Sequence, residues 1–225
     1  VVINVTRGGP GLGTIQPSQS DYFQATKGGA HGDFHLIVLA PNSVQEMHDF
    51  VFDAFDLAFK YRNPVMILSD GVIGQMMEKV VLADQRPRRT AEEIIAQDGD
   101  WALTGKTADR KEHVITSLEL DPYAQERFNE KLIAKYAKIR ENEVRYEEFM
   151  TEDADYIIVA FGSAARICRM TVEMAREAGY KVGLVRPITL YPFPSKVLHD
   201  LAARGVKGFL SAELNHGQMV EDVRL

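Results

Sequence analysis

Residues 1–14, VVINVTRGGPGLGT, hold the stretch of sequence that decides the fold. The apolar run at residues 1–5 predicts a buried strand, and it leads directly into a loop in which four glycines follow Arg7. Glycine permits positive φ and a close approach of the backbone to a ligand, and a guanidinium can hold a carboxylate or phosphate through two parallel hydrogen bonds. We therefore expect an anionic small molecule at the carboxyl end of a parallel strand. A glycine-rich connection beside a surface arginine fits the same pattern equally well.

The loop does not match the two common nucleotide-binding motifs. A Walker-type phosphate loop needs a lysine after its last glycine, and here Thr14 follows Gly13 directly. A dinucleotide fingerprint needs a third glycine after Gly11 and Gly13, and that position is Gln16. Neither nucleotide interpretation is supported.

The composition is that of a globular protein without a membrane or nucleic-acid role. The 225 residues are 45% hydrophobic and 26% charged, with a net charge of -6. No apolar run approaches the ~20 residues of a membrane span, and the negative charge gives no reason to expect a nucleic-acid partner. The single cysteine, Cys168, excludes an internal disulfide and an iron–sulfur cluster ligated by this chain alone. A reducing cytoplasm fits, and the apolar first residues and uncapped last residues lead us to expect a piece of a longer polypeptide.

The first third of the chain predicts a strand–helix–strand unit. A second strand covers residues 35–39, and Ser43 to Glu46 read as a capping box. The helix behind it has apolar residues on nearly every side, so we expect it to be covered on most sides. A third strand covers residues 65–68 and ends at Asp70. Continuous apolar runs of this kind predict parallel strands whose sheet is covered on both faces.

The remainder predicts a second α/β unit after an irregular stretch. Residues from about 84 to 121 have turn and linker composition, and Asp121-Pro122 begins a long helix that we expect to reach about Met150. Further elements are expected in the order strand, helix, strand, helix and strand, at residues 156–160, 164–178, 182–185, 194–204 and 206–213. A tight turn at Gly162-Ser163 would cap the first of these helices. We expect two α/β domains with parallel sheets, residues 1–120 and 121–225.

Other polar positions leave alternatives open. Residues 31–35, HGDFH, could share a face if extended, but the surrounding glycines indicate a loop, so we expect no metal site and give His31 and Asp33 a hydrogen-bonding role in a pocket. Asp70 stands where open α/β sheets place ligands, and it can equally cap a helix that begins at Val72. The polar run at residues 16–21 could orient a ligand or cap a helix near Asp21. Cys168 is expected to be a packing residue, and Met76-Met77 to fill a core or an interface.

The motifs resemble a known family. Residues 4–14, 19–33 and 40–46 resemble the α subunit of the 2-oxoacid:ferredoxin oxidoreductases, and residues 186–194 resemble the second domain of the same subunit. The run GGPGLGTIQPS at residues 8–18 is most similar to the branched-chain, 2-oxoisovalerate type, whereas the 2-oxoglutarate enzymes tend to carry Gly-Pro-Ser-Thr-Gly there. The resemblance spans essentially the whole chain.

This resemblance implies an enzyme that uses thiamine diphosphate. It would oxidatively decarboxylate a 2-oxoacid to an acyl-CoA and CO2, with coenzyme A as co-substrate and with electrons passing through iron–sulfur clusters to ferredoxin. The first domain would be the carboxyl-terminal half of the pyrimidine-binding domain, and the second a transketolase C-terminal-like domain. Arg7 matches the arginine expected to hold the substrate carboxylate, with Gly8 and Gly9 beside it. The residues expected near the cofactor are Gly11, Gly13, Thr14, His31 and Asp33.

The same resemblance implies that other polypeptides complete the site. The family's Tyr-Pro-Ile-Thr-Pro segment and the glutamate that activates the aminopyrimidine ring would precede Val1, and we assign no catalytic residue to this chain. The diphosphate and Mg2+ would sit on a β subunit, and the clusters on γ and ferredoxin-like δ subunits. The fragment alone is therefore expected to be inactive. Two alternatives stay open, a non-catalytic α/β scaffold subunit and a pyruvate- or 2-oxoglutarate-specific or transketolase-like relative.

Overall fold

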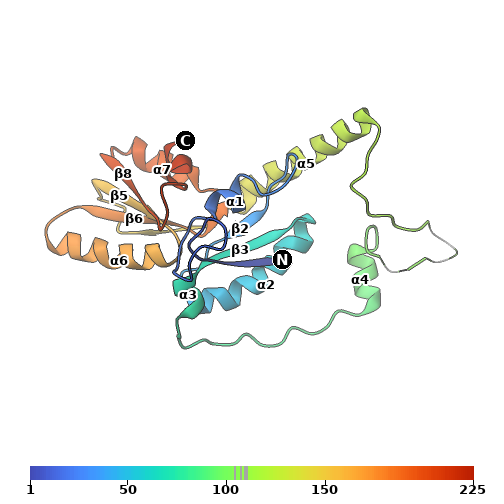
Figure 1. Cartoon of the computed structure of the whole chain (residues 1–225), viewed down its shortest axis with the longest axis horizontal. Helices are drawn as coiled ribbons and strands as arrows, with labels where there is room; N and C mark the ends of the chain where they lie inside the picture. The colour runs from blue at the N-terminus through green and yellow to red at the C-terminus, as the bar shows by residue number, and fades with distance from the viewer. Residues whose placement is uncertain (104, 107, 109–110) are drawn as a thin grey trace. The chain divides into compact units, whose positions relative to one another are not determined.

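The computed structural model describes residues 1–103, 105–106, 108 and 111–225, and Figure 1 shows its helices and strands. The chain divides into two compact units, one made of residues 1–81 and 131–225 and the other of residues 82–130. The boundary between them falls inside helix α5 (Pro122–Asn142). The domain limits expected above, 1–120 and 121–225, stay a prediction.

The larger unit contains a first sheet in the order β1-β3-β2-β7. Strands β1 (Val2–Thr6), β3 (Val65–Asp70) and β2 (Ile37–Leu39) run parallel, as the strand–helix–strand pattern predicts. The fourth strand, β7 (Thr189–Tyr191), was not predicted, and it pairs antiparallel with β2. A three-residue strand between prolines gives too short a pattern to recognise, and its partner lies about 150 residues earlier in the sequence.

A second sheet follows in the order β4-β6-β5-β8. Strands β5 (Tyr156–Ala160), β6 (Val182–Pro187) and β8 (Gly208–Ala212) are parallel, while β4 (Tyr146–Phe149) is antiparallel to β6. The α/β class is therefore confirmed, with the difference that each sheet is mixed rather than wholly parallel.

The expected helix end near Met150 is wrong, because α5 ends at Asn142 and β4 begins four residues later. The next residue, Glu143, is buried and its carboxylate accepts hydrogen bonds from Lys60 Nζ and Tyr61 Oη, each at 2.6 Å. These contacts hold the turn that ends the helix. Tyr146 and Phe149 fit a helical spacing of three, but they belong to the strand.

Alternating strand side chains enter three apolar cores, as strand geometry requires. Ile37 and Leu39 point to α2 (Val44–Tyr61), where the helix buries Phe50, Ala54 and Leu57. Val38 faces the opposite core, which contains side chains of α1 (Tyr22–Thr26) and α7 (Ser195–Ala203) together with Ile157 and Val159 of β5. The third core lies between the other face of β5 and α6 (Gly162–Glu177). The second sheet is thus covered by α6 on one face and by α7 on the other (Figure 1).

One burial expectation is wrong. Among the described residues, strand β1 pairs with β3 alone, so its apolar side chains are about half exposed, Ile3 at 50%. Most residues of helix α2 are buried or half-buried, as expected, and one stripe that includes Phe55 is exposed. Met77 lies outside the core, since its side chain is 97% exposed, and its role in an interface stays a prediction.

The stretch expected to be irregular, residues from about 84 to 121, lies in the smaller unit of residues 82–130, yet it contains α4 (Ala91–Asp98). Thr90 and Glu93 form a complete capping box at its start. Residues 104, 107, 109 and 110 of the irregular stretch lie outside the described residues. Among the described residues, no helix combines the length and apolarity that crossing a membrane would need.

Candidate functional site

The glycine loop lies at the carboxyl end of β1, where the sequence placed it. Its neck is closed by two backbone hydrogen bonds, from Gly8 N to Gln16 O at 2.9 Å and from Thr14 N to Gly8 O at 2.8 Å. Gly13 has φ +57°, and a Cβ there would stand 1.8 Å from Gly8 O, so the loop closes only around a glycine. The loop is therefore a defined turn with exposed backbone, rather than a loose connection.

Arg7 stands at the base of this loop, and its side chain is exposed. One guanidinium nitrogen, Nη1, donates to the carbonyl oxygens of Leu12 and Thr14, the latter at 3.1 Å. Within the described part of the chain, Nη2 and Nε make no hydrogen bond, so an edge of the planar guanidinium is left for a ligand. A carboxylate needs two such donors side by side for a bidentate contact.

Gln19, which follows the loop, is the centre of a buried polar cluster. Its Nε2 donates to Phe161 O at 2.9 Å and to Asp70 Oδ2 at 3.2 Å, while its Oε1 accepts from Leu214 N at 3.1 Å. These three partners lie at the ends of β5, β3 and β8. One amide side chain therefore joins the carboxyl ends of strands from both sheets.

Asp70 serves as a helix cap for two helices. Its Oδ1 accepts from Val72 N and Ile73 N at the start of α3 (Gly71–Gln75), and its Oδ2 accepts from Ser163 N at 2.9 Å in the first turn of α6. The capping alternative for Asp70 is thus confirmed. The expected cap by the Gly162-Ser163 turn is wrong, because the N-cap residue is Phe161 and the carboxylate comes from β3.

Gly162 is what allows this shared cap. It has φ +57°, and a Cβ at that position would lie 2.8 Å from both Asp70 Oδ2 and Gln19 Nε2. Since Asp70, Gln19 and Ser163 are all buried, this cluster is a rigid scaffold rather than a ligand-binding surface.

The turn after β8 forms the other wall of the site. Glu213 accepts hydrogen bonds from three successive backbone N–H groups at residues 218–220, at 3.1, 2.7 and 3.1 Å, at the start of α8 (Val220–Arg224). Gln218 in turn donates to Ser20 O and accepts from Phe23 N, at 2.8 and 2.9 Å. The turn is therefore fixed to the segment that leaves the glycine loop.

A cavity of about 610 Å³ lies between the glycine loop and this turn. It is lined by residues from three segments, Gly9, Pro10, Ser18, Ser20, Asp21, Leu214, Asn215, His216 and Gln218. Its walls carry hydroxyl, amide and imidazole groups and the carboxylate of Asp21, so it suits a polar ligand. Sequence reasoning noticed the polar run at 16–21 but missed the turn at 213–218, whose position after a parallel strand was the available signal.

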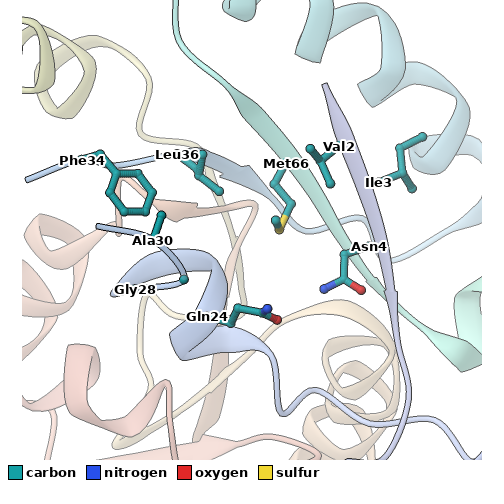
Figure 2. A pocket seen from close by; sticks show the side chains of 10 residues that line it. Val2, Ile3, Asn4, Gln24, Gly28, Ala30, Phe34, Leu36 and Met66 are labelled. Atoms are coloured by element: carbon teal, nitrogen blue, oxygen red, sulfur yellow. The ribbon is translucent and has the colours of Figure 1, made fainter. Parts of the chain in front are cut away.

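His31 and Asp33 lie in the stretch between α1 and β2, and both are exposed. Neither lines the cavity beside the glycine loop. Figure 2 shows a second cavity, of about 490 Å³, at the exposed edge of β1, where Val2, Ile3 and Met66 lie opposite Phe34 and Leu36. The structure thus brings Gly9 together with Ser18 and His216 at the cavity beside the glycine loop, while His31 and Asp33 do not line it.

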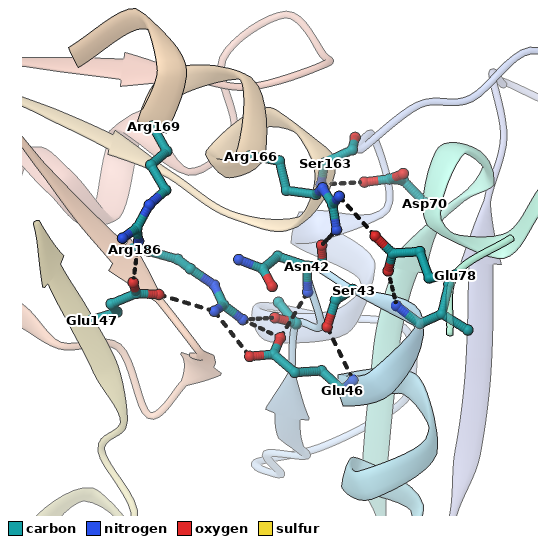
Figure 3. A network of polar contacts seen from close by, with 12 residues as sticks. Asn42, Ser43, Glu46, Asp70, Glu78, Glu147, Ser163, Arg166, Arg169 and Arg186 are labelled. Carbon is teal, nitrogen blue, oxygen red and sulfur yellow. Dashed lines mark hydrogen bonds and ion pairs between the residues drawn. The ribbon is translucent and has the colours of Figure 1, made fainter. Parts of the chain in front are cut away.

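An ion-pair network connects the helix after β2 to the second sheet (Figure 3). Arg186 of β6 is buried, donates to both carboxylate oxygens of Glu46 and also contacts Glu147, with Nη1 at 3.0 Å from Glu46 Oε1 and 3.2 Å from Glu147 Oε2. Ser43 caps α2 by accepting from Glu46 N at 3.1 Å, as predicted, but the reciprocal half of the expected capping box is missing, because the Glu46 side chain turns to Arg186 and Asn42 N. The ion pair between Arg186 and Glu46 therefore connects α2, which packs on the first sheet, to β6 of the second sheet.

Cys168 is buried in α6. Burial raises the pKa of the Cys168 thiol, as for a packed residue in α6. Among the described residues, no group of three or more His, Cys, Asp or Glu side chains is arranged to hold a metal ion.

Ligands of open α/β sheets bind outside the carboxyl ends of the strands, and there this chain carries the glycine loop and the guanidinium of Arg7. The family model described as "Pyruvate flavodoxin/ferredoxin oxidoreductase, thiamine diP-bdg" matches residues 1–148, and "Pyruvate:ferredoxin oxidoreductase core domain II" matches residues 154–225. The chain belongs to the pyruvate flavodoxin/ferredoxin oxidoreductase family.

Two relatives differ in how similar they are to this chain. Ketoisovalerate oxidoreductase subunit VorB of Methanothermobacter marburgensis is 50% identical over 225 residues, covering 100% of this chain and 62% of the relative. The 2-oxoglutarate synthase subunit KorA of Methanocaldococcus jannaschii is 34% identical, with 99% and 64% covered. The chain thus spans about three fifths of the length of these relatives.

A solved structure shares the fold. The 2-oxoglutarate:ferredoxin oxidoreductase of Magnetococcus marinus, determined with 2-oxoglutarate, coenzyme A and succinyl-CoA bound, superimposes with a TM-score of 0.76 at 26% identity. The match covers 99% of this chain and 43% of that chain.

Proposed function

We propose that this chain is part of the α subunit of a thiamine diphosphate-dependent 2-oxoacid:ferredoxin oxidoreductase that acts on branched-chain 2-oxoacids in the cytoplasm. The proposed substrate class is based on sequence identity. The chain is 50% identical, along its whole length, to a ketoisovalerate oxidoreductase subunit and 34% identical to a 2-oxoglutarate synthase subunit. The reaction would convert the 2-oxoacid and coenzyme A to an acyl-CoA and CO2, with two electrons passing to ferredoxin.

Arg7 is the residue that would hold the substrate carboxylate. Its Nη1 is fixed by the carbonyls of Leu12 and Thr14, which orients the plane of the guanidinium, and its free edge faces outward. Gly8 and Gly9 would stand beside the substrate, because their lack of side chains leaves the backbone open to it. The residues proposed to lie near the cofactor are Gly11, Gly13, Thr14, His31 and Asp33.

The side chains that line the cavity beside the glycine loop fit the substrate and the part of the cofactor away from its diphosphate, rather than the diphosphate itself. The cavity beside the loop is lined by a single carboxylate, Asp21, which already accepts a hydrogen bond from Asn4 Nδ2 at 2.9 Å, and otherwise by hydroxyl, amide and imidazole groups. It therefore offers few of the carboxylate oxygens that the ion of a magnesium diphosphate takes. When bound, thiamine diphosphate supplies the nucleophilic carbon and electron sink that decarboxylation requires. We therefore assign the diphosphate, Mg2+ and the iron–sulfur clusters to β, γ and ferredoxin-like δ subunits.

The test is Arg7→Ala in the assembled enzyme. Loss of a charge-assisted bidentate contact should cost about 2–4 kcal/mol, which is seen as a rise of roughly 30- to 1,000-fold in KM or loss of kcat/KM for the 2-oxoacid. Arg127→Ala is the matched control, since Arg127 is an exposed arginine of α5 whose one ion pair with the described residues is to Asp121, at 3.9 Å. An unchanged KM for Arg7→Ala would instead support the scaffold alternative.

The substrate class needs its own measurement. Initial rates with 2-oxoisovalerate, pyruvate and 2-oxoglutarate should give the largest kcat/KM for the branched-chain acid. A larger value for either of the others would reject the branched-chain assignment while leaving the family and the role of Arg7 intact.

A further inference from the structure

Helix α6 presents an apolar stripe on the side that faces away from the protein core. Its inner side packs Ala164, Ala165, Cys168 and Val172 against the second sheet. Its outer side carries Ile167, Met170 and Met174, each 64% exposed. Spacings of three and four residues put these three side chains on one face over about 10 Å of helix.

Charges beside this stripe change sign along the helix. Arg166 lies near the amino-terminal end, and Glu173 and Glu177 lie near the carboxyl-terminal end, at positions that place all three on the same flank of the stripe. Arg166 is held in place by Asn42 O and Glu78 Oε1, at 3.1 and 2.8 Å (Figure 3). Glu173 and Glu177 are exposed and make no hydrogen bond or ion pair with the described residues.

This pattern is complementary to itself when two copies of the helix run antiparallel. With a two-fold axis beside Met170, Ile167 of one copy would face Met174 of the other. Arg166 of each copy would then lie opposite the turn that carries Glu173 and Glu177 of its partner. Antiparallel helix dipoles add to the attraction. A parallel pair would instead put the charged flanks of the two copies on opposite sides of the contact, so Arg166 would not meet the glutamates of the partner.

We propose that the outer face of α6 is a contact between two copies of this chain, packed antiparallel about a two-fold axis at Met170. One helix pair of this length is smaller than the roughly 800 Å² per partner of a standard stable interface. The contact is therefore expected inside the assembled enzyme, where other interfaces hold the copies close together.

The experiment uses the assembled full-length enzyme with Met170→Cys and a short bis-maleimide cross-linker. The expected product on a denaturing gel is a covalent pair of two α subunits. Ile133→Cys, at a site 60% exposed on α5, is the matched control and should give no such pair. Native Cys168 is buried, and the unmodified enzyme measures its background.

A charge exchange separates the proposed contact from general disruption. In the Met170→Cys background, Glu173→Lys with Glu177→Lys should reduce the cross-linked fraction at least fivefold. Adding Arg166→Glu in the same chain should restore it, because each copy would then meet reversed charges.

Two results would overturn the proposal. One is an introduced thiol in Met170→Cys that reacts freely with a monofunctional maleimide but gives no α–α product. The other is an introduced thiol that is unreactive, or that becomes linked to another subunit or another segment.

Discussion

The glycine loop and the Gln19–Asp70 cluster both follow strand ends within the same unit, yet they are built in opposite ways. The loop exposes its backbone and holds Arg7 through a single guanidinium nitrogen. In the cluster, both carboxylate oxygens of Asp70 and both amide atoms of Gln19 are occupied by protein groups. The difference teaches that the buried polar residues at the carboxyl ends of these strands position the loop, while the exposed ones remain available to bind.

Asp70→Ala should have the largest effect on stability. It removes the acceptor for backbone N–H groups at the starts of α3 and α6 and for Gln19 Nε2, all inside the protein. Leaving such donors unsatisfied should lower the free energy of unfolding by about 3–5 kcal/mol. The measurement is the denaturant midpoint at constant slope.

The matched control for that variant is Asp200→Ala. Among the described residues, the side chain of Asp200 contacts Lys196 alone, in an exposed pair, so the change in stability should be less than about 0.5 kcal/mol. Equal effects at the two positions would remove the distinction between scaffold and surface carboxylates.

Gln19→Leu should have the next largest effect. It keeps the side-chain bulk but leaves Leu214 N and Phe161 O without their partner, at a cost of about 2–3 kcal/mol. Hydrogen exchange at the Leu214 amide should accelerate in the full-length protein, while the control Gln24→Leu should leave that amide protected. Slow exchange in both variants would show that the turn after β8 does not depend on Gln19.

Gly13→Ala and Gly11→Ala test whether closure of the glycine loop positions Arg7. Both glycines have positive φ, so both variants incur the left-handed penalty of roughly 1–2 kcal/mol. Only at position 13 does the new Cβ also collide with Gly8 O, while position 11 has open space around it. KM for the 2-oxoacid should therefore rise about tenfold more in Gly13→Ala, a difference of ~1.4 kcal/mol. Equal KM values would mean that loop closure does not position Arg7.

Tyr61→Phe should have the smallest effect, and a pH-dependent one. Burial raises the pKa of Glu143, but hydrogen bonds from Lys60 and Tyr61 and the nearby positive charges lower it more, so the pKa lies below its usual value of 4.5. Because the folded-state pKa is lowered, the stabilisation is present above about pH 4.5 and is lost as the pH falls through the folded value.

Removing one hydrogen bond should cost about 1 kcal/mol at pH 7 and less below pH 4. Thermal unfolding at several pH values checks the sign. A larger loss for Tyr61→Phe in acid than at pH 7 would contradict the assignment.

Much of this fold could be predicted from the sequence. Apolar runs located β2, β3, β5 and β6, Ser43 marked the start of α2, and Asp121-Pro122 marked the start of α5. These signals are local, because each depends on residues a few positions apart.

The features that sequence reasoning missed depend on distant partners. The end of α5 is set by Lys60 and Tyr61, about 80 residues before Glu143. The role of Gln19 depends on groups that are 51 to 195 residues away along the chain. Polar residues of this kind could be noticed in the sequence, but their partners could not be named. The roles of Arg7, His31 and Asp33 in binding stay predictions.

Strand β7 has a consequence for how such proteins can be divided. Its three residues come from the last quarter of the chain, between β6 and β8 of the second sheet, and they complete the edge of the first sheet beside β2. A gene cut anywhere between β2 and Thr189 would strip that edge and leave β2 open to pair with foreign strands. The two halves therefore cannot be exchanged as independent modules. A chimera should be joined beyond β8 rather than at the apparent linker, because a junction between Tyr191 and β8 would strip the edge strand from β5 in the second sheet.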